Sequence, residues 1–246
     1  GANTTGAGNI AMGYQALATA TTVSNNTAVG HSALAANTSG DENTAVGSGA
    51  LDANTTANAC VGVGFNALGS NTTGIHNTSL GWGANRLGTT GAHNTFVGSA
   101  TGYISAVAGS YNTGIGREAL HNNTTASNNT ALGYTALKAV TTGPENTAIG
   151  VAALTALTDA EGNTALGKSA GDVITTGDKN TCIGHSTDPS ANNGAHQIAI
   201  GANAVGKGDS TGFMNANGGA NYAGNNSASW STTSDRRIKK NIEDNN

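Results

Sequence analysis

The sequence is poor in charged, aromatic and proline residues, and it contains no long apolar run. Only 10% of its residues are charged and 4% are aromatic, and it has two prolines and two cysteines. The formal net charge is −4, and no basic stripe precedes the C-terminal segment, so we expect no nucleic-acid partner. The apolar runs are far shorter than the roughly 20 residues of a membrane helix, so we expect no membrane insertion.

What the sequence has in abundance is glycine, at 37 residues, together with Asn, Thr and Ala. The stretch Asn43-Thr44-Ala45-Val46-Gly47 recurs in near copies, and the last glycine of each copy serves as an anchor. The anchor glycines are Gly13, Gly30, Gly47, Gly64, Gly81, Gly98, Gly116, Gly133, Gly150, Gly167, Gly184 and Gly201. Successive anchors are 17 residues apart except for one 18-residue step, from Gly98 to Gly116. Such regular spacing identifies a repeat array.

Positions within one repeat are numbered here from its anchor glycine. Position −1 is always a large aliphatic residue, position −2 is mostly Ala, and position −3 is mostly Thr. This short alternation predicts a brief β-strand rather than a helix, which glycines and Asn-Thr pairs would oppose. Ala at +3 and Leu at +4 predict an inward-facing second strand or bend, followed by a Thr-rich return and a turn.

The fold class predicted is therefore all-β, a parallel β-solenoid (a β-roll or β-helix) of about twelve 17-residue coils. Equal coils place like residues above one another. The Asn at −4, as in Asn26 and Asn43, should form a ladder in which each amide bonds its neighbours, as stacked Asn does in cross-β structures. The glycine corners serve as structural positions alongside it, and the ones that we single out are Gly30, Gly47, Gly133 and Gly150.

The departures from the repeat suggest where the domains end. Cys60 replaces Asn at −4 and should break the ladder, and the 18-residue step indicates one extra residue in a turn. We predict the solenoid over 1–206, a Gly/Asn/Ser-rich connector or stem over 207–233, and a different segment over 234–246.

One coil buries few sizeable apolar side chains for the seventeen residues that it orders. Because conformational entropy opposes that ordering, we expect further burial against other copies of the chain, in a homo-oligomer. The composition does not fix the number of copies.

Position +1 varies most, which is typical of an outward face. Tyr14, Phe65, Trp82 and Tyr134 stand there. They are candidates for stacking on sugar rings of a surface glycan. The alternative is that they pack between chains, as aromatic residues commonly do in interfaces.

Other chemistry is scarce. Cys60 and Cys182 belong to distant repeats, so we expect small buried fillers rather than a disulfide. The histidines have no metal-ligand spacing, and we expect neither a metal site nor a cofactor. The sequence shows no tight pair of carboxylates of the kind that a glycosidase needs.

The last segment carries a resemblance. Ser234-Asp235-Arg236-Arg237-Ile238-Lys239-Lys240-Asn241-Ile242-Glu243 resembles the start of the self-cleaving intramolecular chaperone domain of phage tail fibres and tailspikes (endosialidase type, peptidase S74). The resemblance implies cleavage between Ser234 and Asp235, with Ser234 as nucleophile and Lys239 as its base. Most of that domain would lie beyond Asn246, so we expect no enzyme activity and an inert cleavage site here.

The repeats also resemble the heads of trimeric autotransporter adhesins, which are parallel β-rolls with a strand-Gly-x-x-Ala pattern. Together the two resemblances imply a homotrimeric, structural and adhesive fibre. We expect the distal segment of a phage tail fibre on a virion, contacting a glycan or protein of the host surface. The alternative is the head of a bacterial cell-surface adhesin; a glycan-degrading tailspike is the third, disfavoured candidate.

Overall fold

A computed structural model shows a solenoid that advances by one coil for each anchor glycine. It describes residues 5–104, 108–216, 219–223 and 231–232. Twelve of its strands have three residues each, and three further strands follow at the C-terminal side. The strands are β1 (Ile10–Met12), β2 (Thr27–Val29), β3 (Thr44–Val46), β4 (Val61–Val63), β5 (Thr78–Leu80), β6 (Thr95–Val97), β7 (Thr113–Ile115), β8 (Thr130–Leu132), β9 (Thr147–Ile149), β10 (Thr164–Leu166), β11 (Thr181–Ile183), β12 (Ile198–Ile200), β13 (Gly212–Ala216), β14 (Gly219–Ala223) and β15 (Ser231–Thr232).

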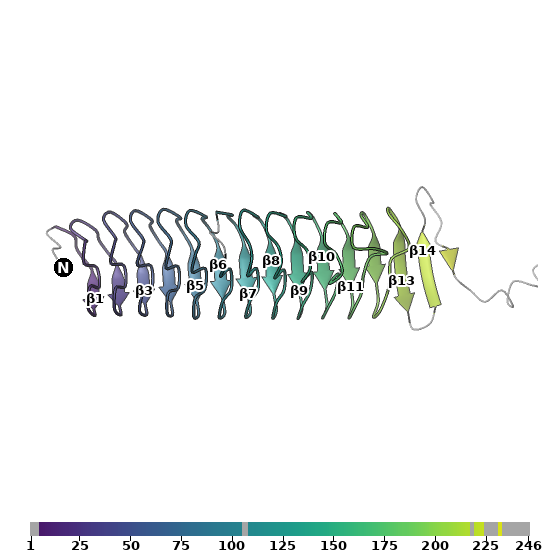
Figure 1. Cartoon of the computed structure of the whole chain (residues 1–246), viewed down its shortest axis with the longest axis horizontal. Helices are drawn as coiled ribbons and strands as arrows, with labels where there is room; N and C mark the ends of the chain where they lie inside the picture. The colour runs from purple at the N-terminus through teal and green to yellow at the C-terminus, as the bar shows by residue number, and fades with distance from the viewer. Residues whose placement is uncertain (1–4, 105–107, 217–218, 224–230, 233–246) are drawn as a thin grey trace, which may run out of the picture.

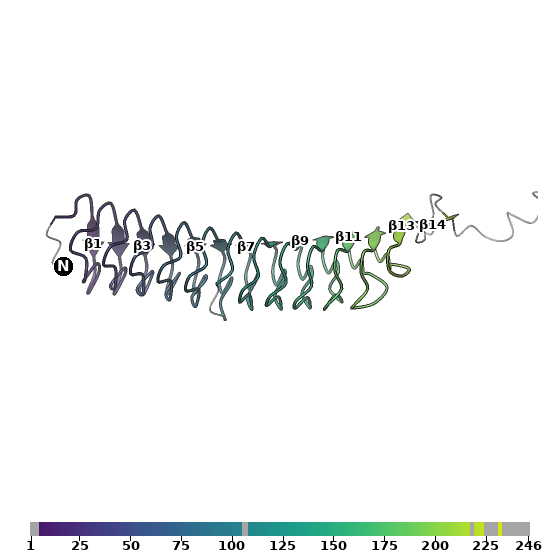
Figure 2. The ribbon, with the colours of Figure 1, turned by 90° about the horizontal axis from the view of Figure 1, so that it is seen from above.

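The strands stack in sequence order into one sheet that runs the length of the rod (Figure 1). Each strand from β1 to β12 pairs in parallel with the next, with like positions opposite one another, as in Thr27↔Thr44 and Val29↔Val46. Seen from above, the strands again form one row along the rod, with the turns beside them (Figure 2). The predicted parallel β-solenoid is thus confirmed, and the described residues form no helix.

Each coil contains one strand, and the rest is a run of turns. Positions +3 and +4 face inward as predicted: Ala33 and Leu34 are fully buried. They form a bend, however, and not a second strand. The backbone of this segment alternates between right-handed and left-handed conformations, since residues at +2 and +4 have positive φ, for example 56° at Ser32 and 51° at Leu34. A left-handed residue interrupts the extended conformation that a strand needs.

The anchor glycines are required by both conformation and packing. Gly133 has φ of 143°, and a Cβ built there would lie 2.3 Å from the carbonyl oxygen of Gly150 in the next coil. Gly30 and Gly47 make the same close approach to the next anchor in the column. Any side chain at these corners would therefore push stacked coils apart.

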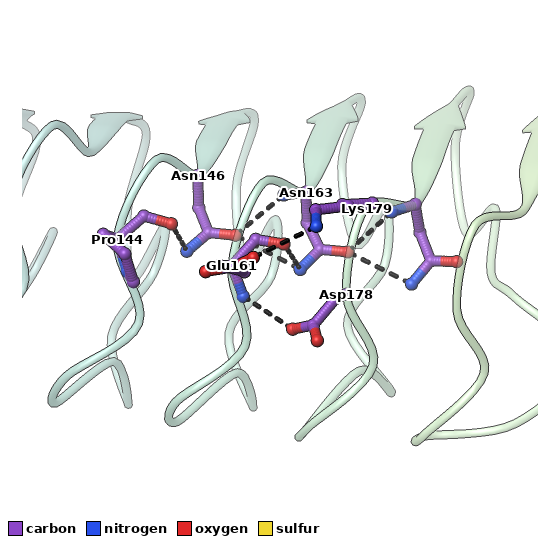
Figure 3. Close-up of polar contacts among 7 residues, drawn as sticks. Pro144, Asn146, Glu161, Asn163, Asp178 and Lys179 are labelled. Carbon is purple, nitrogen blue, oxygen red and sulfur yellow. Dashed lines mark hydrogen bonds and ion pairs between the residues drawn. The ribbon is translucent and has the colours of Figure 1, made fainter.

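The Asn column at −4 is present, but its bonds differ from the predicted amide-to-amide ladder. In Asn26, the side-chain oxygen accepts the backbone N–H of Asn43 at 2.9 Å, and the side-chain nitrogen donates to the backbone oxygen of Gly40 at 3.0 Å. Each amide therefore joins its coil to the backbone of the next coil. Figure 3 shows the bonds of the side-chain oxygens: that of Asn146 accepts the backbone N–H of Asn163 at 2.9 Å, and the amide-to-amide contact of 3.2 Å between the same residues is longer. The reason is that backbone N–H and C=O groups at these buried corners need partners.

Cys60 interrupts the amide column without opening a gap. Its backbone N–H still donates to the Asn43 side chain at 2.9 Å, and its thiol lies 3.2 Å from the carbonyl oxygen of Gly74, where an amide would donate. The predicted break is thus a weakened link, because a thiol is a poor hydrogen-bonding group.

Two more polar columns run parallel to the first. Position +7 carries a second set of buried amides in four coils, Asn37, Asn54, Asn71 and Asn123. Asn37, for example, both accepts from and donates to the backbone of Gly40. At +8, threonine hydroxyls donate to carbonyl oxygens of the next coil, as Thr55 does to Thr72 at 3.1 Å. The sequence analysis treated this segment only as a Thr-rich return and missed the buried role of both positions.

The coil with the 18-residue step has its own core packing. Phe96 replaces the usual small residue at −2 and is fully buried. Its ring occupies space left by Gly102 and Gly114, where a Cβ would meet the ring at 3.0 and 2.9 Å. Backbone pairing with the following coil is regular at Ile104 and again at Ala108. The predicted extra residue thus falls between them, at 105–107, outside the described residues.

The sheet continues past the last anchor glycine. β13 pairs in parallel with β12, so that Phe213 lies opposite Ala199 and is buried over the end of the core. β14 and β15 then pair antiparallel. Part of the segment expected to be a connector, 207–233, thus extends the sheet.

Candidate functional site

The aromatic side chains at +1 all lie on the surface of the chain. Tyr14, Phe65, Trp82 and Tyr134 are 69%, 48%, 50% and 47% exposed. They form separate groups and not one row. Tyr14 stacks on His31 with ring centroids 5.4 Å apart, whereas Tyr134 lies under the guanidinium of Arg117.

The largest group is a stack of four rings, which we call the aromatic cluster: Phe65, Trp82, Tyr103 and His121. Successive ring centroids are 6.3, 5.4 and 5.8 Å apart, and the ring planes lie within 22° of parallel. The members come from four consecutive coils. With coils about 4.8 Å apart, the cluster extends over roughly 14 Å.

Tyr103 and His121 stand at +5, and sequence analysis did not select them. The structure shows that +1 of one coil meets +5 of the next, since Trp82 stacks on Tyr103. Gly83 makes this possible, because a Cβ there would lie 2.6 Å from the Tyr103 ring. The only sequence signal is that +5 holds Arg86, Tyr103 and His121 in three successive coils.

A polar pocket adjoins the aromatic cluster. It has a volume of about 260 Å³ and is lined by Asp52, Ala53, Asn66, Gly69, Ser70, Arg86 and Leu87. Asp52, Gly69 and Arg86 occupy +5 in successive coils. The pocket exists because Gly69 contributes no side chain between the acidic group and the basic one.

Arg86 links the pocket to the aromatic cluster. Its Nη1 donates a hydrogen bond of 2.8 Å to the Tyr103 hydroxyl, and its guanidinium carbon lies 5.6 Å from the Tyr103 ring centroid. Opposite, partial burial raises the pKa of the Asp52 carboxyl, an effect opposed by backbone N–H groups of Ala53 and Asp52 and by the charge of Arg86. Acceptor and donor groups thus face one pocket from two sides.

Two other carboxylates have altered acidity. Glu118 bonds Lys138 at 2.9 Å and Arg117 at 2.7 Å, and the Lys138 contact is the main reason that the pKa of Glu118 is lowered. The pKa of Asp188 is raised, first by burial and then by the charge of Asp172. One oxygen of Asp188 is buried without a hydrogen-bond partner among the described residues. The sequence analysis did not predict that Asp172 and Asp188 lie close to each other.

The cysteines are free and buried, as expected. Burial raises the pKa of the Cys60 thiol, and burial together with the charge of Asp188 raises that of Cys182 to about 12. Both thiols therefore stay protonated near neutral pH. In the part of the chain that the structure describes, no three His, Cys, Asp or Glu side chains are placed to hold a metal ion.

The predicted self-cleavage residues, Ser234, Asp235 and Lys239, lie outside the described residues, and their arrangement stays a prediction. Across the described ranges, no helix is long and apolar enough to cross a bilayer. Comparisons of the chain with family models, with curated proteins and with solved structures gave no match.

Proposed function

We propose that this chain is a structural and adhesive segment of a homotrimeric fibre. The observation that carries the proposal is an aliphatic column on the outer face of the sheet. From β2 to β12 the strand residue at −2 is buried, whereas the residues at −1 point outward and none of the twelve is buried. The column consists of Met12, Val29, Val46, Val63, Leu80, Val97, Ile115, Leu132, Ile149, Leu166, Ile183 and Ile200.

The column continues through all twelve coils, so its extent is that of the rod. Within it, Leu132 is 44% exposed and Leu166 is 46% exposed. Contiguous apolar surface of this kind is typical of faces that pack against a partner. A second copy in parallel register would present an identical column at the same spacing, and three copies would enclose the columns around a common axis.

The rod-like shape suits a segment that holds a contact surface away from its base. The resemblance of Ser234 to Glu243 to the chaperone of tail fibres supports placement in the distal part of a phage tail fibre, on the virion. The strand-Gly-x-x-Ala pattern supports the alternative, the head of a bacterial trimeric adhesin. A glycan-degrading tailspike is not favoured, because the pocket presents one carboxylate, that of Asp52, and glycoside hydrolysis commonly uses two.

The mass of the chain in solution tests the proposal. Light scattering after size exclusion should give three times the chain mass of 24.0 kDa. Replacing Leu132 and Leu166 together by Asp should shift the protein toward monomers, because charges would be buried against apolar neighbours. Thr142→Asp, at an exposed turn position, is the matched control and should leave the trimer intact. A wild-type protein that stays monomeric up to high concentration would refute the proposal.

A further inference from the structure

We infer that the pocket and the aromatic cluster together form a binding site for a neutral, hydroxyl-rich oligosaccharide. The inference deepens the proposed function by naming the partner of its adhesive surface. The site itself lies on one chain, so its chemistry does not depend on how many chains assemble.

The first argument is chemical. Sugar rings present apolar C–H faces edged by hydroxyl groups. Phe65 and Trp82 are about half exposed and present apolar aromatic surface against which such rings could pack. Beside them, the Asp52 carboxylate can accept hydroxyl protons, and the Arg86 guanidinium can donate to hydroxyl oxygens.

The second argument concerns groups that have no other use. Within the described ranges, the side chains of Asn66 and Ser70 line the pocket and make no hydrogen bond to the protein. This differs from the columns at −4 and +8, whose polar groups bond the next coil. Polar groups that contribute nothing to coil stacking remain free to bind a ligand.

The third argument is the limited extent of the cluster. A contact between parallel copies would repeat in every coil, as the aliphatic column does. The aromatic cluster occupies four coils, and Tyr14 and Tyr134 are separate from it. A length of roughly 14 Å fits a ligand of a few rings better than it fits the face of a second copy.

The charge of the site selects among saccharides. The pocket holds one acidic and one basic side chain, those of Asp52 and Arg86, whose charges balance. The whole chain carries a net charge of −4, which opposes polyanions at low salt. The geometry therefore points to uncharged sugars.

Binding can be measured on an array of immobilised neutral hexose and N-acetylhexosamine oligosaccharides, with sialylated and uronic-acid counterparts. Trp82 and Trp230 are the two tryptophans of the chain, so a Trp230→Phe variant makes tryptophan fluorescence report on Trp82 alone. A neutral oligosaccharide that binds should change that fluorescence in proportion to occupancy.

Four variants locate the site. Trp82→Ala should weaken binding by about tenfold or more, in line with the loss of a central aromatic contact, whereas Trp82→Phe should retain most of it. Gly69→His should abolish binding by filling the pocket. This change should preserve folding, because His121 occupies the same position three anchors further along and Gly69 lacks a positive φ. Tyr134→Ala, an equally exposed +1 aromatic outside the cluster, should have no effect.

The inference is overturned if no neutral oligosaccharide binds, if only acidic glycans bind, or if Trp82→Ala and Gly69→His bind like the unmodified protein. Light scattering of each variant keeps this test apart from that of the fibre. An unmodified protein that is trimeric but binds no neutral oligosaccharide contradicts the site alone, and an unmodified protein that binds sugar as a monomer contradicts the fibre alone.

Discussion

Removing one amide from the −4 column tests what holds the coils together, and Asn129→Ala is the sharpest version. The Asn129 side-chain oxygen accepts the backbone N–H of Asn146 at 2.8 Å, and its nitrogen donates to the Gly143 carbonyl at 3.0 Å. Alanine would leave the buried N–H unpaired, at about 1–3 kcal/mol. The Gly143 carbonyl would keep a bond from the Asn146 side chain at 3.2 Å, so its loss adds only about 1 kcal/mol. We expect a total destabilisation of about 2–4 kcal/mol.

The assay combines a global and a local measurement. Urea unfolding followed by circular dichroism, at fixed protein concentration, should show a lower midpoint for Asn129→Ala than for the exposed control Thr125→Ala. Because stability in a solenoid depends on contacts between neighbouring coils, hydrogen exchange should speed up first at Asn146. Circular dichroism alone could miss such a local opening.

Asn129→Asp separates hydrogen bonding from packing, because Asp has nearly the same shape. The ionised carboxylate keeps the acceptor but cannot donate to Gly143, and its burial is costly. Burial raises the pKa of such a carboxyl, so the folded state gains stability as pH falls through that raised value. This variant should be the least stable at pH 7 and should approach the wild type in acid. Equal midpoints for all variants, with unchanged exchange at Asn146, would refute the bonding role of the column.

Three further predictions concern other departures and irregular contacts. Cys60→Asn should stabilise the protein by about 1 kcal/mol by restoring a donor and an acceptor, and a lower urea midpoint would contradict this. Phe96→Ala should cost about 3–5 kcal/mol, since Gly102 and Gly114 have no side chains to fill the space; a loss below about 1 kcal/mol would mean that the coil collapses instead. Asp188→Asn should raise stability at pH 7 but not in acid. The pKa of Asp188 is raised in the folded protein, so the wild type loses stability as pH rises through that pKa. Urea midpoints equal to those of the wild type at both pH values would count against this prediction.

The sequence was most informative where a position serves the same purpose in every coil. The Thr-small-aliphatic alternation at −3 to −1 predicted all twelve short strands, and each anchor glycine marks a corner with positive φ. The inward orientation of Ala33 and Leu34 was also predicted. In each case the spacing of 17 residues makes one local preference visible many times.

The sequence was least informative where backbone conformation departs from common preferences. Leu34 is left-handed, a conformation that a bulky side chain rarely adopts. Nothing in the composition of that segment therefore distinguished a bend from a strand. The amide bonds of Asn26 were misjudged for a related reason, because their partners are backbone groups in the next coil, whose positions depend on the shape of the turn.

Only part of the candidate site could be predicted from the sequence, and the reason is geometric. Trp82 attracted attention as an exposed aromatic at a variable position. Its partners depend on a contact between +1 of one coil and +5 of the next, which no spacing within a coil reveals. The pocket depends on Gly69, whose importance lies in a missing side chain.

The departures from the repeat and the candidate site meet in the same coil. Gly102 replaces the usual Leu and accommodates the Phe96 ring, and the extra residue follows between Ile104 and Ala108. Between these changes stands Tyr103, whose ring contacts Trp82 and Arg86. The hydrogen bonds between coils are regular on both sides of this coil, so the rod tolerates its irregularity. The most irregular coil of the array thus supplies the ring on which both halves of the proposed sugar site depend, which is where a repeat protein can add binding chemistry without loss of its fold.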